Sequence, residues 1–168
     1  MVGFGGQAAA IRLDGFLCAA HVAEENGVQV RITAGEKPPC AMADPVRMTE
    51  CFDELFANAL HWFDKAEKRV DVAISTANKE SVPRDLDGTK EYVRIVFADN
   101  GCGIPFDKKE GVFGAFYTTH PHGTGLGLSL VQRVVEGQGG LIREVGKPGE
   151  GAVFELYVPE TAPAAQAS

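Results

Sequence analysis

The 168-residue chain lacks the features of a membrane-spanning, secreted or zinc-binding protein. No uninterrupted apolar run approaches the ~20 residues that a membrane helix needs, and the N-terminus lacks the basic-then-apolar order of a signal peptide. The four cysteines form neither a Cys-x-x-Cys pair nor the Cys/His spacing of a zinc site. We therefore expect a soluble, cytoplasmic segment with reduced thiols and no membrane contact of its own, even where a longer parent protein is membrane-anchored.

Positive charge is also scarce, with 16 Lys and Arg residues against 23 Asp and Glu and a net charge of −7. Such a chain repels nucleic acid and anionic lipid, so neither is an expected partner, and local groups must bind any anionic ligand. Its length and its 45% apolar residues are typical of one globular domain. We expect this domain over residues 12–160, with a disordered or truncated end over 1–11 and a disordered tail over 161–168.

Hydrophobic periodicity predicts a mixed fold. Apolar residues at helical spacing predict three helices, over residues 11–25, 44–66 and 124–136. Alternating β-branched runs predict five strands, over residues 28–33, 69–76, 91–98, 141–145 and 153–158. Asp44-Pro45 is a strong helix start, because Asp caps free amides and Pro loses no bond at the first position.

The order of these elements predicts the fold class. The second and third strands are expected to pair antiparallel, and the last two to form a hairpin. Helices and strands do not alternate regularly, and we find no internal repeat. We therefore predict an α+β fold, a two-layer α/β sandwich with a mixed, mostly antiparallel sheet covered by helices on one face.

The first polar motif lies on the long predicted helix. Glu54, Asn58 and His61 are spaced i, i+4, i+7, so their side chains stack on one stripe beside the apolar face. A carboxylate there suits the orientation of water or an incoming nucleophile, and a carboxamide suits Mg²⁺, which keeps several waters. The alternative is that Glu54 and Asn58 are simply solvated surface residues.

The second motif, Asp-Asn-Gly-Cys-Gly-Ile at residues 99–104, directly follows a predicted strand. An Asp at a strand end, beside two glycines, places an acceptor carboxylate next to backbone that a flat ligand can approach closely. This arrangement suits the amino edge of adenine. The alternative is a tight Asn-Gly turn.

The third motif is a glycine-rich loop that enters a helix, His-Gly-Thr-Gly-Leu-Gly-Leu-Ser-Leu at residues 122–130. Free amides at a helix N-terminus form an anion site, so phosphates can bind here. The loop lacks the Gly-Lys-Ser/Thr ending of a Walker loop. It does not follow the first strand of a β-α-β unit either, so it is not a dinucleotide-binding fingerprint.

In this order and at these separations, the motifs resemble the N box (54–62), the first glycine box (99–104) and the second glycine box (123–127) of the ATP-binding domain of sensor histidine kinases. That family belongs to the GHKL superfamily of Bergerat-fold ATPases, with DNA gyrase B, MutL and the ninety-kilodalton heat-shock chaperones. The resemblance covers roughly residues 12–160. Residues 112–119 are similar to the F box, which favours the kinases. The short lid that follows is similar to that of nitrogen-regulation-type sensors.

The resemblance implies a Mg-ATP site and assigns roles at the matching positions. Glu54 would polarise the attacking group, Asn58 would be the Mg²⁺ ligand, and Asp99 would bind adenine. Trp62 falls where the family often places an aromatic against the purine, the alternative being a core tryptophan. The implied nucleotide-binding set also includes Gly101 and Gly103 as the pocket floor, His61, Ile104, Thr118, Thr119, His120, Gly123, Thr124, Gly125, Leu126 and Gly127.

Several positions depart from the family pattern. His61 and His120 stand where these kinases usually carry Lys or Arg against the phosphates. An imidazole with a reference pKa of about 6.5 is only partly charged at neutral pH, so we expect phosphate affinity to vary with pH. Cys102, Gln138 and Ala152 replace a common Pro, His and Thr, which bears on catalytic strength more than on the fold.

The chain lacks the run that usually marks a phosphate-accepting histidine, a His followed by Glu or Asp and then Pro; we interpret His21 as an ordinary helix residue. The resemblance implies a phosphoacceptor histidine domain on the parent chain or dimer mate, and a response-regulator receiver domain, as partners. We expect a monomeric fragment with at most slow ATP turnover. The alternatives are a nucleotide-gated interaction module and an anti-sigma-type serine kinase of the same superfamily.

Overall fold

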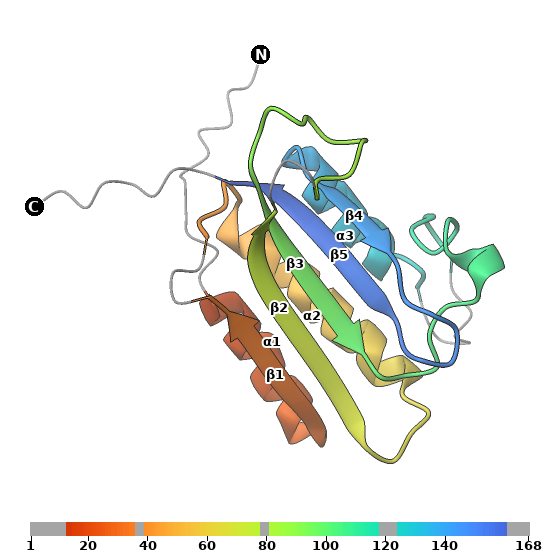
Figure 1. Ribbon diagram of the computed structural model, residues 1–168. Coiled ribbons are helices and arrows are strands. Elements are labelled where there is room, and N and C mark those ends of the chain that lie inside the picture. Colours follow the sequence, from red (N-terminus) through yellow and green to blue (C-terminus); the bar gives the residue numbers. More distant parts are fainter. Residues whose placement is uncertain (1–12, 36–38, 78–80, 118–123, 161–168) are drawn as a thin grey trace, which may run out of the picture.

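The computed structural model describes residues 13–35, 39–77, 81–117 and 124–160, with side chains from residue 19 onward (Figure 1). Its elements are α1 (Leu13–Glu25), β1 (Val28–Ala34), α2 (Pro45–Trp62), β2 (Lys68–Ala77), β3 (Tyr92–Asp99), the short 3-10 helix η1 (Phe106–Lys108), α3 (Gly127–Gly137), β4 (Leu141–Glu144) and β5 (Val153–Pro159). Each helix and strand predicted from the sequence is present. None of the described helices is long and apolar enough to cross a membrane.

The five strands form one sheet in the order β1-β2-β3-β5-β4. β1 runs parallel to β2, and every other neighbouring pair is antiparallel. The helices α1, α2 and α3 lie side by side over one face of this sheet (Figure 1). The predicted two-layer α+β fold is therefore confirmed, as are the predicted pairings of β2 with β3 and of β4 with β5.

The alternation of side chains along the central strand β3 determines which of them face the helices. Val93, Ile95 and Phe97 are buried in the main core, and the Phe97 ring meets Phe56 of α2 edge to face, with ring centroids 4.9 Å apart. Because side chains on a strand alternate with a period of two, Asp99 at the end of β3 faces the helix layer as well. The register of β3 thus carries a carboxylate into the interface between the sheet and the helices.

The start and the end of α2 have different causes. Asp44 Oδ1 accepts hydrogen bonds from two amides of the first turn, at 2.9 and 3.3 Å, so the predicted N-cap is confirmed. The predicted end near residue 66 is wrong, because α2 ends at Trp62 and Phe63 turns to extended backbone, with φ −67° and ψ 121°. The Trp62 carbonyl accepts a hydrogen bond from the Cys102 amide at 3.1 Å. A contact with a loop distant in sequence therefore accompanies the end of this helix.

The predicted start of the last helix at residue 124 is also wrong, since α3 begins at Gly127. Gly125 has a φ of +67°, in the left-handed region, and so cannot belong to a right-handed helix. Its carbonyl accepts a hydrogen bond from the amide of Phe116 at 2.9 Å. This contact with the preceding segment sets the backbone before α3, and hydrophobic periodicity alone does not reveal it.

We expect Asp44→Ala to lower the free energy of unfolding by about 1 kcal/mol, because it removes the side-chain acceptor for the first amides of α2. Urea denaturation measures this loss. Asp44→Ser, which keeps an acceptor oxygen, should retain most of the stability. Glu136→Ala, which removes an exposed carboxylate from α3, is the control. An Asp44→Ala chain as stable as the wild type would show that this cap contributes nothing.

Candidate functional site

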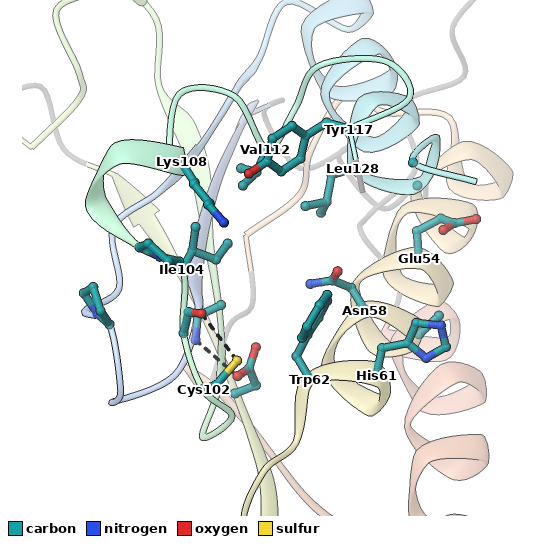
Figure 2. A pocket seen from close by; sticks show the side chains of 18 of the residues that line it. Glu54, Asn58, His61, Trp62, Cys102, Ile104, Lys108, Val112, Tyr117 and Leu128 are labelled. Carbon is teal, nitrogen blue, oxygen red and sulfur yellow. Dashed lines mark hydrogen bonds between the residues drawn. The ribbon is translucent and has the colours of Figure 1, made fainter. Parts of the chain in front are cut away.

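A cleft of about 570 Å³ opens between the second half of α2 and the segment that follows β3 (Figure 2). The start of α3 and the turn between β4 and β5 complete its walls. All three polar motifs of the sequence contribute lining residues, although about sixty residues separate the end of the first motif from the start of the third. The fold therefore brings the three predicted motifs together at one place.

The helix α2 forms one wall. Glu54, Asn58, His61 and Trp62 all line the cleft, whereas the neighbouring Leu55 is completely buried in the core. The predicted polar stripe beside the apolar face of this helix is thus present. Figure 2 shows Asn58 and Trp62 directed into the cleft, while His61 points away from its centre.

Asp99 is a buried carboxylate at the end of the cleft, with only 7% of its surface exposed. Its Oδ1 accepts hydrogen bonds from the amides of Gly101 (2.8 Å) and Ala152 (3.1 Å). Within the described residues, no donor contacts its second oxygen, Oδ2. Burial raises the pKa of Asp99 above its ordinary value and the charge of Glu144 adds to this, whereas the two amides and Lys65 lower it. One carboxylate oxygen is therefore held in place and the other remains available as an acceptor.

The first glycine motif is shaped by its close approach to the end of α2. A Cβ atom on Gly101 would lie 2.6 Å from the carbonyl oxygen of Trp62, so any larger residue would force these two segments apart. Gly101 is buried beneath the cleft and does not line it, whereas Cys102, Gly103 and Ile104 do. Burial, with the charge of nearby carboxylates, raises the pKa of the Cys102 thiol, so this group is neutral at physiological pH.

The second glycine motif reaches the cleft through Thr124, Gly125 and Gly127, while Leu126 is 41% exposed and lies outside the lining. Glu54 of α2 approaches the start of α3, since a Cβ atom on Gly127 would collide with Glu54 Oε2. This carboxylate therefore stands near the positive end of the α3 dipole. The remaining predicted nucleotide-binding residues fall outside the described residues: Thr118, Thr119, His120 and Gly123.

Several lining residues were not predicted from the sequence. Lys108, Tyr117 and Leu128 line the cleft, and Figure 2 shows the Lys108 side chain extending toward its interior. Within the described residues, no carboxylate pairs with the Lys108 ammonium group. Lys108 and Lys109 are adjacent in the sequence, and no periodicity or motif distinguishes the lysine that faces the cleft from the one that does not.

Lys109 instead makes a buried ion pair with Glu144 of β4, and its ammonium group also donates to the Gly146 carbonyl. Glu144 Oε1 accepts hydrogen bonds from the amides of Gly146 (2.8 Å) and Val153 (3.2 Å). A buried charge pair persists only when such additional bonds satisfy its oxygens. This cluster fastens the segment after η1 to the β4–β5 hairpin and so fixes one side of the cleft.

The polar groups of the cleft suit a metal ion that receives most of its coordination from waters and a bound ligand. Within the described residues, no group of three or more His, Cys, Asp or Glu side chains could hold a metal ion. Asn58 offers a single neutral oxygen, on a side chain that points into the cleft. Mg²⁺ needs near-octahedral oxygen coordination and is commonly completed by waters and phosphates, so one carboxamide is a sufficient protein contribution.

Comparison with known proteins supports one family. The family model described as "Histidine kinase-, DNA gyrase B-, and HSP90-like ATPase" matches residues 43–162. The chain is 36% identical over 137 residues to the sensor histidine kinase ZraS of Salmonella typhimurium, an alignment that covers 82% of this chain and 27% of ZraS. The chain spans about a quarter of the length of the curated relatives it matches.

Solved structures share the fold. The chain is similar to full-length ShkA in complex with AMPPNP, with a TM-score of 0.75 and 24% identity, covering 98% of this chain and 33% of ShkA. It is also similar to the mycobacterial sensor histidine kinase MprB, with a TM-score of 0.71 and 20% identity, covering 88% of this chain and 94% of that one. These likenesses establish the architecture of the chain and not its ligand.

We expect Asp99→Asn to raise the free energy of unfolding at neutral pH. Burial raises the pKa of Asp99 in the folded chain, so its ionised form opposes folding, and this cost disappears when the group is protonated at low pH. Asparagine keeps an acceptor for the two amides without the charge. The gain over the wild type should therefore be absent below about pH 4, the reference pKa of Asp, and should grow as the pH rises above it in urea titrations.

The control for this experiment is Asp85→Asn, which changes an exposed carboxylate and should alter stability little at any pH. A gain from Asp99→Asn that is the same at every pH, or a loss at neutral pH, would contradict the presence of a costly buried charge.

Proposed function

The chain belongs to the family of histidine kinase-, DNA gyrase B- and HSP90-like ATPases, and we propose that it is the ATP-binding catalytic domain of a two-component sensor histidine kinase. In this proposal the cleft binds Mg-ATP, and the γ-phosphoryl group passes to a histidine outside this chain. The observation that carries the proposal is the convergence of a buried carboxylate, a carboxamide and a helix start on one cleft. The similarity to ZraS favours a kinase over the interaction module and the serine kinase.

Adenine is proposed to bind at the Asp99 end of the cleft. Its 6-amino group would donate to Asp99 Oδ2, while Trp62 offers a flat aromatic surface and Ile104 and Leu128 offer apolar contacts. A purine with a carbonyl at position 6 would place an acceptor against the buried carboxylate and leave it unpaired, at a cost of about 1–3 kcal/mol. The carboxylate would thus select adenine over guanine.

The triphosphate is proposed to extend from there toward Asn58 and the start of α3. Asn58 would be the protein ligand of Mg²⁺, which neutralises phosphate charge when bound. Free amides at the start of α3 would hold the phosphates, and Lys108 would supply a fixed positive charge at the cleft. These local groups would bind a polyanion despite the net charge of −7.

Glu54 is proposed to act on the attacking group. During transfer, a histidine nitrogen forms a bond to the γ-phosphorus while the bond to the bridging oxygen breaks, and ADP leaves. Glu54 would accept a hydrogen bond from the other ring N–H and so orient and polarise the imidazole. Its place beside the start of α3 supports this role, because the proposed phosphate site lies there. The remaining contribution of the chain is positioning and charge neutralisation.

The partners are part of the same proposal. Because the chain spans only about a quarter of its relatives, the phosphoacceptor histidine domain is proposed as a separate partner, on the same parent chain or on a dimer mate. A response-regulator receiver domain would then take the phosphoryl group from that histidine. A cytoplasmic location, where Mg-ATP is available, fits this sequence of reactions.

We expect Asn58→Ala to abolish the Mg²⁺-dependent part of the ATP affinity while changing the free energy of unfolding by no more than about 0.5 kcal/mol. The side chain points into the cleft and not into the core. Calorimetry with ATP in Mg²⁺ and in EDTA measures this, and Trp62, the only tryptophan, provides a fluorescence readout. Gln29→Ala, which removes an exposed carboxamide from β1, is the control. Unchanged Mg-ATP binding by Asn58→Ala would refute the metal assignment.

We expect the chain to transfer phosphate from labelled ATP to a supplied histidine-bearing helical hairpin and not to label itself. Glu54→Gln should slow this transfer by at least about 100-fold with ATP affinity little changed, because the residue acts on the attacking group. Asp85→Gln is the control. ATP binding without any transfer would favour the interaction module, and labelling of a serine would favour the serine kinase.

A further inference from the structure

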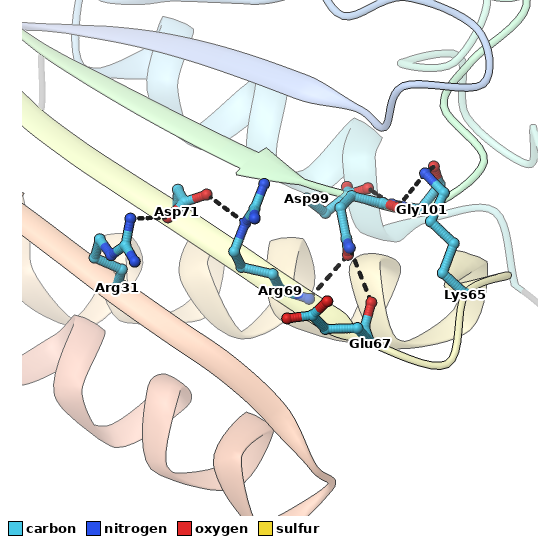
Figure 3. Close-up of polar contacts among 8 residues, drawn as sticks. Arg31, Lys65, Glu67, Arg69, Asp71, Asp99 and Gly101 are labelled. Atoms are coloured by element: carbon cyan, nitrogen blue, oxygen red, sulfur yellow. Dashed lines mark hydrogen bonds and ion pairs between the residues drawn. The ribbon is translucent and has the colours of Figure 1, made fainter.

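Lys65, in the loop between α2 and β2, binds three backbone carbonyls at the purine end of the cleft. Figure 3 shows Lys65 beside Gly101. Its ammonium group donates to the carbonyl of Asn100 at 2.8 Å, and to those of Gly101 and Gly149 at 3.4 Å each. An ammonium group has three protons, so these acceptors use its full capacity. Lys65 therefore links the segment after β3 to the turn between β4 and β5.

These are the two segments that hold the carboxylate of Asp99. One of the amides that donate to Asp99 Oδ1 belongs to Gly101, in the segment after β3, and the other belongs to Ala152, just after the β4–β5 turn. The separation of these two donors sets the orientation of the carboxylate plane. Lys65 joins the same two segments through their carbonyls.

Other contacts in this region hold only one of the two segments to β2. Asn100 Oδ1 accepts from the Arg69 amide at 2.8 Å, and Asn100 Nδ2 donates to the Glu67 carbonyl at 2.9 Å. These bonds attach the segment after β3 to the start of β2 (Figure 3). A backbone bond from the Gly149 amide to the Cys102 carbonyl, at 2.7 Å, joins the two segments directly. Lys65 adds a charged side chain to this junction.

The charge of Lys65 also acts on Asp99. Burial and the carboxylate of Glu144 raise the pKa of Asp99, whereas Lys65 and the two amides oppose this shift. Glu144 itself is paired with Lys109. The ammonium group of Lys65 therefore favours the ionised form of the carboxylate that would accept the adenine amino group.

We propose that Lys65 is a positioning residue for purine recognition, which orients Asp99 by cross-linking the segment after β3 to the β4–β5 turn. The inference rests on the proposed function, in which Asp99 accepts the 6-amino group of adenine. Lys65 does not line the cleft, so it acts through Asp99 and not on the nucleotide. Neither the polar motifs nor the resemblance assigned a role to this residue.

The test compares Lys65→Met, which keeps the aliphatic stem without the charge, with Lys65→Arg and with Lys147→Met. Lys147 is a matched control, because it lies on the same β4–β5 turn but its ammonium group pairs with Glu150 at 3.7 Å, with both side chains largely exposed. Calorimetry measures binding of ATP and of purine riboside triphosphate, which lacks the 6-amino group. Binding of each is followed across pH, and urea denaturation verifies that every variant is folded.

We expect Lys65→Met to weaken ATP binding by about fivefold, a modest factor because the ammonium group is partly in solvent. Binding of purine riboside triphosphate should change much less. The loss of ATP affinity on acidification should move to higher pH, because without the cation the pKa of Asp99 rises and the acceptor is protonated earlier. Lys65→Arg should restore affinity and pH profile, and Lys147→Met should match the wild type. If Lys65→Met does not fold, Lys65→Gln serves the same comparison.

Asp99→Asn distinguishes a failure of the proposed adenine contact from a failure of the proposed role of Lys65. If Asp99→Asn binds ATP as tightly as the wild type, the proposed adenine contact is wrong. If Asp99→Asn loses ATP affinity while Lys65→Met keeps the affinity, selectivity and pH profile of the wild type, the proposed function survives and the role of Lys65 is overturned. Equal weakening of both nucleotides by Lys65→Met would also overturn it, since a general disturbance of the cleft would not act through the amino group.

Discussion

The carboxylate of Asp99 is removed from water at the end of the central strand and held there by amides from two separate segments. An ionised group in such a place is costly unless it is hydrogen-bonded, so the surrounding backbone must keep both donors in position. Gly101 has to lie against the end of α2, and the β4–β5 turn has to lie against the segment after β3. The geometry of the cleft follows from meeting these requirements together.

The helix α2 contributes to stability on one face and to the cleft on another. Leu55 and Phe56 are buried against the sheet, while Asn58 and Trp62 face the cleft (Figure 2). Because both sets share one rigid helix, packing of the core fixes the polar side chains relative to Asp99 on β3. The site therefore draws its precision from the same contacts that hold the two layers together.

In this acidic chain, three lysines near the cleft have different partners. Lys108 extends into the cleft, Lys109 is paired with Glu144, and Lys65 is bonded to backbone carbonyls near Asp99. The three lysines are chemically identical and differ only in their partners. These partners leave Lys108 accessible to a ligand, whereas Lys109 and Lys65 hold segments of the chain together. Such local placement allows anion binding although the long-range field of the chain is repulsive.

The resemblance to sensor histidine kinases implied that the three motifs, on α2, at the end of β3 and at the start of α3, form one site. Periodicity and spacing sufficed to predict the two-layer fold, each helix and strand, and the Asp44 cap. These features are local or periodic, so short stretches of sequence encode them. Tertiary structure decided where α2 ends (Trp62) and where α3 begins (Gly127). It also decided the burial of Gly101 and the different roles of Lys65, Lys108 and Lys109. Each depends on a contact with a segment distant in the chain, such as the bond from the Cys102 amide to the Trp62 carbonyl, and no local pattern records which distant group will be the partner.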